Sequence, residues 1–143
     1  MQPGWLPTGA ELVTTLELDE ETPSNNVIKN MHHFEYRNTR KRWAMRVFVA
    51  LGGRRPKQPI ERAFLVIRRE CAGEGLDWDN AYGGLKPLLD CLVSPTEKRN
   101  PDGLGVIRDD KLRNMPYPPF VQQVKGVKGK GRTTVQVYAL PDE

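Results

Sequence analysis

Two short apolar runs with strand spacing restrict what this chain can fold into. In residues 11–18 (ELVTTLEL), Leu12, Leu16 and Leu18 all occupy positions of one parity, as one face of a half-buried strand requires. Residues 61–71 (ERAFLVIRREC) form a second run, rich in branched and aromatic side chains. The chain is therefore expected to build a sheet.

Helical spacing appears between these two runs. From about residue 38 to 51, Trp43, Val47 and Leu51 recur every fourth residue among basic side chains, which is typical of an amphipathic helix. The glycine pair at 52–53 ends this pattern. The segment before the helix, TPSNN at residues 22–26, has the composition of a turn and is expected to end the first strand.

The second half of the chain adds one helix and a terminal pair of strands. A short helix is predicted around residues 87–93, and a hairpin is predicted from residues 121–127 and 133–140 with its turn at 128–131. The order strand–helix–strand–helix–strands predicts an α+β fold, a mixed β-sheet with two main helices packed on it. A chain of 143 residues fits a single domain, residues 1–143.

Charges are sorted along the chain, although the net charge is only +4. Residues 1–28 hold five acids and no base, residues 37–69 hold eleven bases and one acid, and residues 111–132 hold six bases and no acid. If the basic segments share a face, that face attracts polyanions such as DNA. The alternative is a set of solvated helix and strand faces, and composition leaves the two about even.

A first acidic group follows the second predicted strand. Asp77 and Asp79 flank Trp78, and in an extended backbone their carboxylates point to the same side. Such carboxylates repel each other unless a proton or a metal lies between them, and Mg²⁺ prefers hard oxygen ligands. The next residue, Asn80, has a side chain suited to capping a helix or binding a ligand water. Taken alone, this group is better explained as ordinary loop residues.

Further charged residues lie downstream. Lys86 and Asp90 are four residues apart, which places them on one helix face. Pro87 is tolerated in the first turn of a helix, so the helix is predicted to begin near Lys86, and residues 80–84 are predicted to form a turn. The pair Asp109-Asp110 ends a short apolar run, residues 104–107, that is expected to be a strand.

Three motifs in this order resemble the signature of the RusA family of Holliday junction resolvases. They are D-W-D-N at 77–80, K-P-L-L-D-C-L at 86–92 and G-V-I-R-D-D at 105–110. The TPSNN turn also resembles the turn that follows the family's first strand. The likeness runs in order through roughly residues 16–140. One departure is the interval of seven residues from Asp79 to Lys86, where the family has about four; both intervals return to one helix face. The departure bears on substrate preference more than on the metal site.

The resemblance implies a Mg²⁺- or Mn²⁺-dependent endodeoxyribonuclease acting in DNA recombination and repair. It implies that Asp77, Asp79 and Asp110 bind the metal and are catalytic together with Lys86. The secondary candidates are Asn80, Asp90 and Asp109. The resemblance further implies a homodimer that nicks four-way junctions in pairs, and a bacterial, prophage or phage origin. The alternative function is a non-catalytic DNA-binding protein of the same fold.

Sequence-independent DNA contacts are expected from the basic segments. The candidate residues are Arg40, Lys41, Arg46, Arg54, Arg55, Lys57, Lys125, Lys128 and Lys130. Apolar side chains that the core does not need are candidates for the dimer interface, namely Trp5, Leu6 or the face that carries Phe64 and Val66.

The remaining features indicate a cytoplasmic protein without a membrane partner. No apolar run approaches the length that spans a bilayer. Cys71 and Cys91 have neither metal-ligand spacing nor a disulfide pattern, so two buried thiols in a reducing compartment are expected rather than a disulfide.

Overall fold

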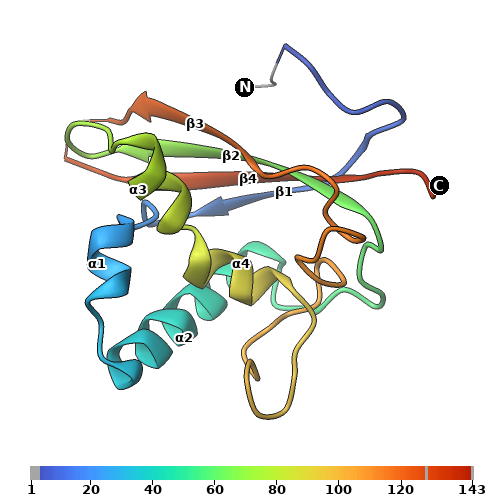
Figure 1. Cartoon of the computed structure of the whole chain (residues 1–143), viewed down its shortest axis with the longest axis horizontal. Helices are drawn as coiled ribbons and strands as arrows, with labels where there is room; N and C mark the ends of the chain where they lie inside the picture. The colour runs from blue at the N-terminus through green and yellow to red at the C-terminus, as the bar shows by residue number, and fades with distance from the viewer. Residues whose placement is uncertain (1–3, 128, 143) are drawn as a thin grey trace.

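The computed structural model describes residues 4–127 and 129–142. Its elements form one four-stranded sheet with the helices on one side of it (Figure 1). In chain order the elements are β1 (Glu11–Leu18), α1 (Asn25–Lys29), α2 (His33–Ala50), β2 (Ala63–Cys71), α3 (Trp78–Gly83), α4 (Lys86–Leu92), β3 (Phe120–Lys125) and β4 (Arg132–Ala139). The predicted α+β fold with one mixed sheet is confirmed.

The strand order β1-β4-β2-β3 differs from the predicted terminal hairpin. Both predicted strands form, but β2 lies between them: β4 is antiparallel to β1 and β2, whereas β3 is parallel to β2. The reason is that β2 is apolar on both faces, with residues 63–67 all buried, so it buries most in an inner position. The prediction of a β3–β4 hairpin is therefore wrong.

Strand β1 changes face near its beginning. Leu16 and Leu18 are buried as predicted, but Leu12 is half exposed. The register against β4 shifts between Leu12 and Thr14, and a shift of one residue turns the following side chains to the other face. The simple alternation predicted for residues 11–18 therefore holds only for its second half.

Helix α2 ends at Ala50 before two glycines with positive φ, close to the predicted end, but it begins earlier than predicted. Its N-cap is His32, whose Nδ1 accepts from the Phe34 backbone N–H at 3.4 Å. Histidine is not among the usual capping residues, so the sequence did not mark this start. Trp43 and Val47 are fully buried against the sheet, as the helical spacing indicated.

Two short helices replace predicted turns. The TPSNN segment does end β1, but Ser24 also caps α1 by accepting from the Val27 backbone N–H at 3.2 Å. The predicted turn at residues 80–84 is wrong, because α3 extends to Gly83. The glycines at 83 and 84 allow close packing instead: a Cβ at Gly84 would lie 1.6 Å from the carbonyl oxygen of Pro23.

The face of the sheet away from the helices is partly covered by the chain itself. Phe64 and Val66 are buried there, and the edge of the Trp5 ring packs on Phe64 at 6.0 Å between centroids. The predicted interface face is therefore occupied within one chain, although Trp5 itself is more than half exposed.

Cys71 and Cys91 are free and buried, as expected. No helix in the described parts of the chain combines the length and apolarity that a membrane span needs.

Candidate active site

The three acidic motifs lie on neighbouring parts of the fold. Helices α3 and α4 follow each other almost without a break, and residues 104–108 run along the C-terminal end of α4. The Leu104 N–H donates to the Cys91 carbonyl at 2.8 Å, and the Ile107 N–H donates to the Leu92 carbonyl at 3.0 Å. The expected strand at 104–107 is reduced to a single bridge with Ile60. The segment that precedes Asp109-Asp110 is thus fastened to the helix that carries Lys86 and Asp90.

Asp77 and Asp79 are both exposed at the beginning of α3. Asp77 is the N-cap residue and makes no side-chain capping bond, while Asp79 lies in the first helical turn. The predicted extended backbone across the two aspartates is not found, because α3 begins at Trp78 and Asp79 is already helical. The argument that an extended backbone directs both carboxylates to one side therefore does not apply. Acidic side chains at the N-terminus stabilise a helix, so Asp77 and Asp79 favour the beginning of α3 over an extended backbone.

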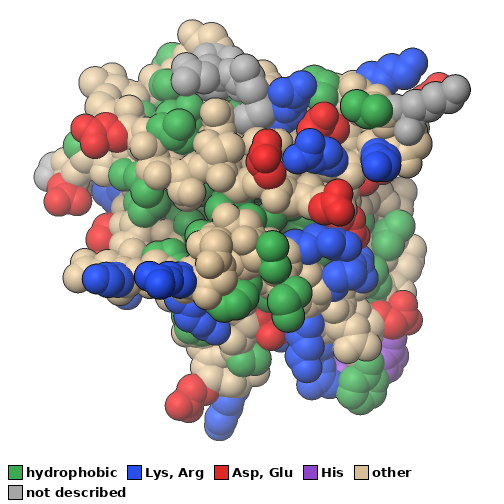
Figure 2. All heavy atoms as spheres, turned by 180° about the vertical axis from the view of Figure 1, so that it is seen from behind, with side chains coloured by type: hydrophobic (Ala, Val, Ile, Leu, Met, Phe, Trp, Pro, Cys, Tyr) green, Lys and Arg blue, Asp and Glu red, His purple; other side chains and the backbone are tan. Residues whose placement is uncertain are grey.

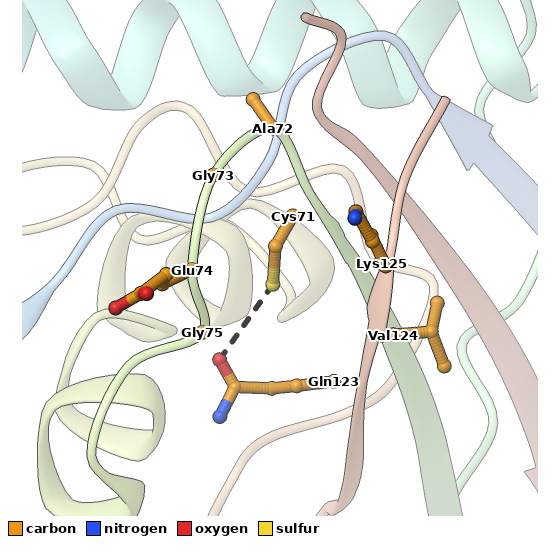
Figure 3. Close-up of a pocket in the computed structure, with 8 residues that line it drawn as sticks. All are labelled: Cys71, Ala72, Gly73, Glu74, Gly75, Gln123, Val124 and Lys125. Carbon is orange, nitrogen blue, oxygen red and sulfur yellow. Dashed lines mark hydrogen bonds between the residues drawn. The ribbon is translucent and has the colours of Figure 1, made fainter. Parts of the chain in front are cut away.

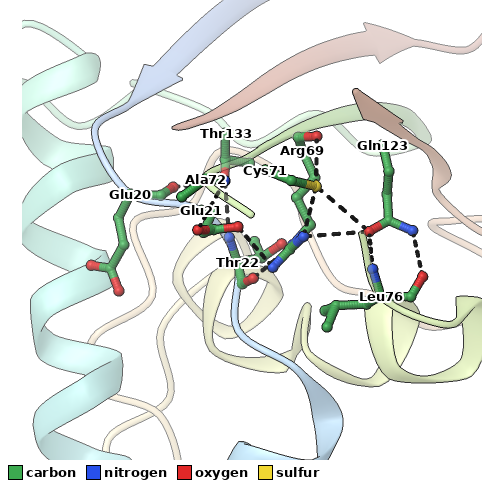
Figure 4. A network of polar contacts seen from close by, with 9 residues as sticks. All are labelled: Glu20, Glu21, Thr22, Arg69, Cys71, Ala72, Leu76, Gln123 and Thr133. Atoms are coloured by element: carbon green, nitrogen blue, oxygen red, sulfur yellow. Dashed lines mark hydrogen bonds and ion pairs between the residues drawn. The ribbon is translucent and has the colours of Figure 1, made fainter. Parts of the chain in front are cut away.

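A polar network positions the loop that leads to Asp77 (Figure 4). The Gln123 side chain of β3 accepts from the Leu76 N–H at 2.8 Å and donates to the Leu76 carbonyl at 2.7 Å. Buried Arg69 lies behind it, where it donates to the Thr22 carbonyl at 2.8 Å and pairs with Glu21 at 3.0 Å. Strand β3 thereby fixes the backbone immediately before the first aspartate of the motif.

The same loop borders a hollow at the end of β2 and β3. Residues 71–75 and 123–125 line it, and Cys71 and Gln123 point toward each other across it while Glu74 points away (Figure 3). The Cys71 sulfur lies 2.9 Å from Nη1 of Arg69 and is almost fully buried. Gln123, which lines this hollow, is the residue that holds the loop before Asp77.

Asn80 joins α3 to α1. Its Oδ1 accepts from the Asn26 backbone N–H at 3.2 Å. The side chain thus satisfies a free N–H in the first turn of α1, a helix other than the one that follows it in sequence. It links the TPSNN segment to the D-W-D-N motif, two parts of the sequence resemblance that are 54 residues apart.

Lys86 and Asp90 share one face of α4, as their spacing predicted. The Lys86 Nζ lies 3.6 Å from Asp90 Oδ2 and 5.3 Å from the centre of the Tyr36 ring. The Tyr36 hydroxyl donates to the same Asp90 oxygen at 2.5 Å, and burial followed by this contact raises the pKa of Tyr36. Asp90 is therefore held by α2, whereas the Lys86 ammonium remains largely exposed.

Tyr36 was not among the residues predicted from the sequence. It lies on α2 four residues before Arg40 and seven before Trp43, which continues the helical spacing toward the N-terminus. Extending that spacing upstream would have found it.

The pKa values of Asp109 and Asp110 shift in opposite directions, although the two residues are adjacent. Burial opposes ionisation of Asp109, but the Asp110 backbone N–H donates to its Oδ1 at 2.7 Å, and the pKa of Asp109 is lowered overall. The pKa of Asp110 is raised, first by burial and then by Asp109, with a further contribution from the charge of Asp90. Asp110 thus lies in a locally negative environment that a cation would relieve.

The predicted metal ligands match a hard cation in chemistry but are not gathered. Asp77 and Asp79 are exposed carboxylates. The ionised form of Asp110 is disfavoured, first by burial and then by its acidic neighbours. Across residues 4–127 and 129–142, no three histidine, cysteine or acidic side chains lie close enough to hold a metal ion. The carboxylates of Asp77, Asp79 and Asp110 are therefore not assembled into one site in this conformation.

Charges that are separate in sequence meet in the fold. Arg42 and Arg46 of α2 both donate to Glu20 at 2.9 Å, and Arg69 pairs with Glu21. The acidic N-terminal segment thus neutralises part of the basic ones. On the face seen in Figure 2, acidic and basic side chains are interspersed. Of the two alternatives that the composition left open, this side shows solvated faces of mixed charge and not one shared basic face.

Arg40 was predicted to contact DNA, but its side chain is buried. Its side chain is only 8% exposed, its Nε pairs with Asp102 at 2.8 Å, and its Nη1 donates to the Arg99 carbonyl at 3.1 Å. A buried guanidinium with these partners has no access to a phosphate, so Arg40 fastens the loop after α4 to α2.

The other predicted DNA contacts differ in accessibility. Arg46 is partly exposed and tied to Glu20. Exposed members of the set are Lys41, Arg54, Arg55, Lys57, Lys125 and Lys130. Lys128 lies outside the described residues.

No family model, curated protein or solved structure matches this chain. The likeness to the RusA family is therefore carried by the motifs of the sequence.

Proposed function

We propose that this protein is a Mg²⁺-dependent endodeoxyribonuclease that resolves four-way DNA junctions. The observation that carries the proposal is the order of the motifs D-W-D-N, K-P-L-L-D-C-L and G-V-I-R-D-D, together with their positions on consecutive, hydrogen-bonded parts of the fold. Acids and lysines are common, but a set of this order in adjoining elements is typical of a phosphodiester-cleaving site.

Asp77, Asp79 and Asp110 would hold the metal, Mg²⁺ or Mn²⁺. When bound, such an ion lowers the pKa of a water molecule and neutralises charge on the scissile phosphate. Asp77 and Asp79 are exposed to solvent and so accessible to a metal ion. The pKa of Asp110 is raised first by burial and then by the negative charge of Asp109, and a cation would offset that charge. The three carboxylates have to come together when DNA binds, since they are apart in this conformation.

Lys86 would position the phosphate or stabilise charge that develops on it. The Lys86 side chain is 60% exposed, so its ammonium reaches solvent from α4. Asp90 and Tyr36 restrict where that ammonium lies, because Asp90 is itself held by the Tyr36 hydroxyl. We therefore assign Asp90 and Tyr36 as positioning residues. Asp109 orients the segment of Asp110 through its bond to the Asp110 N–H.

The alternative is a DNA-binding protein of the same fold that does not cleave. The observation behind this alternative is the set of exposed basic side chains, which includes Lys41, Arg54, Arg55 and Lys57 and which can contact phosphates without any catalytic group. Such a protein keeps these side chains and needs no metal.

One experiment separates the two. Purified protein is incubated with a labelled synthetic four-way junction, with Mg²⁺, with Mn²⁺ and with a chelator. Paired nicks that need the metal are expected. Tight junction binding without nicks under any of the three conditions would reject the enzyme and support the alternative.

A further inference from the structure

A second hollow lies along the edge strand β3, where Trp78 of the D-W-D-N motif borders it. It measures about 620 Å³, and Arg68, Trp78, Phe120, Gln122 and Val124 are among the residues that line it. Pairing of Arg68 with Gln122 and of Glu70 with Val124 across β2 and β3 puts these side chains on one face of the sheet. Trp78 reaches the hollow from the first turn of α3.

The aromatic side chains of this hollow expose large apolar surfaces. Trp78 is 55% exposed and Phe120 is 37% exposed, although burial of such large apolar side chains would stabilise the fold. The nearest ring to Trp78 is Tyr82, at 6.5 Å between centroids. Exposed aromatic rings beside a polar pocket are a common way of binding planar, partly polar ligands.

Arg68 adds a positive charge with unused hydrogen-bonding capacity. Its Nε is buried and has no hydrogen-bond partner within the described residues. A buried guanidinium donor without a partner is costly. The Arg68 side chain as a whole is only partly buried and lines the hollow, and a guanidinium fits a phosphate oxygen in charge and geometry. Glu70 lies two residues further along the same face of β2 and carries the opposite charge.

We propose that this hollow binds an unpaired nucleotide of single-stranded DNA. The base stacks on Trp78 and contacts Phe120, the Gln122 amide contacts the edge of the base, and Arg68 contacts a neighbouring phosphate. This inference rests on the proposed function for the choice of DNA as ligand, and it names the substrate as DNA with an unpaired base at the branch. Because Trp78 stands between Asp77 and Asp79, the bound nucleotide adjoins the residues proposed to cleave.

The test measures binding without cleavage. Fluorescence anisotropy in a chelator gives the affinity for a labelled oligothymidylate of roughly 16 nucleotides, a length within the range of single-strand sites. A strand of equal length with abasic positions keeps the phosphates and removes the bases. The wild-type protein should bind the intact strand more tightly, since stacking on an aromatic side chain depends on the base.

Variants of Trp78 locate the effect. Trp78→Ala should weaken binding of the intact strand by about 5- to 100-fold, the range expected for one stacked base, and should leave binding of the abasic strand nearly unchanged. Trp78→Phe keeps a ring and should recover most of the preference for bases, whereas Trp78→Leu keeps apolar area alone and should not. Phe34→Ala, which removes another exposed aromatic side chain at the start of α2, is the matched control and should have no effect.

Arg68 is tested on the same strands. Arg68→Gln should weaken binding of both the intact and the abasic strand, because it removes a phosphate contact, and Arg68→Lys should restore part of the loss. Equal affinity of the wild type for the two strands, or equal effects of Trp78→Ala and Phe34→Ala, would overturn the inference. Junction nicking with no base preference would leave the proposed function standing alone. Base-dependent binding without nicking would reject the enzyme and keep this site.

Discussion

Among single residues, Asp77, Asp79 and Asp110 carry the proposed chemistry. Replacing any one of them with asparagine should abolish Mg²⁺-dependent nicking and leave junction binding largely intact, because the amide keeps the shape and loses the charge that binds the metal. Gel analysis of a labelled junction measures nicking, and anisotropy in a chelator measures binding. Asp109→Asn should be milder, since Asp109 bonds to the backbone. Full cleavage by any of the three variants would refute the site assignment.

Asp110 also allows a test by its protonation. Its pKa is raised by burial and by Asp109, so over the pH range between its unfolded and folded pKa the folded chain holds a proton that the unfolded chain has lost. This carboxyl therefore favours folding more as pH falls and less as pH rises through that range; Asp109, whose pKa is lowered, has the opposite dependence. Asp109→Asn should lower the pKa of Asp110, measured by carboxyl ¹³C NMR. Asp19→Asn, at an exposed position after β1, should not.

Between elements, the packing of α3 on the segment before α1 depends on glycine. A Cβ at Gly84 would overlap the Pro23 carbonyl, so Gly84→Ala should force the backbones apart and cost about 1–3 kcal/mol of unfolding free energy. Urea unfolding followed by circular dichroism measures it. Gly73→Ala is the matched control, because a Cβ there meets nothing within 4 Å. Equal stability of the two variants would mean that the close approach is not needed.

For the whole molecule, the distribution of charge decides how DNA binds. Phosphate contacts by exposed bases make affinity fall with salt, at a slope of about −0.9 per neutralised phosphate on duplex arms. Charge reversal of the exposed residues Arg54, Arg55 and Lys57 should weaken binding to all sequences about equally and reduce the slope. Arg40→Met should change stability rather than the slope, because Arg40 is buried against Asp102. A plot of log affinity against log salt that stays flat would contradict phosphate binding.

Assembly belongs to the same scale. A four-way junction has two-fold symmetry, and one chain offers a single acidic site, so paired cutting requires two chains. We expect a dimer at micromolar concentration, with a mass twice the 16.3 kDa of the chain by light scattering. The exposed Trp5 is the remaining candidate of the predicted interface. A mass of one chain both with and without junction DNA would count against a resolvase and leave a simple nicking enzyme.

Local patterns were enough to find most of the elements. The spacing of Trp43 and Val47 marked the buried face of α2, and the apolar run at 63–67 marked β2, because burial on one or two faces leaves a periodic trace in the chain. The spacing of Lys86 and Asp90 likewise predicted their shared face, since it depends only on helix geometry.

Contacts between distant segments were decided only by the tertiary structure. The β3–β4 hairpin was wrong because β2, apolar on both faces, enters between those strands, and adjacency in sequence carries no information about such an insertion. Arg40 resembles its exposed basic neighbours in sequence, yet it is buried and paired with Asp102. Tyr36 reaches Asp90 across 54 residues of chain. The sorted charges of the sequence are mixed in space for the same reason. Folding places Glu20 against Arg46 and Glu21 against Arg69, and a charge that loses water on folding is strongly unfavourable without an oppositely charged partner.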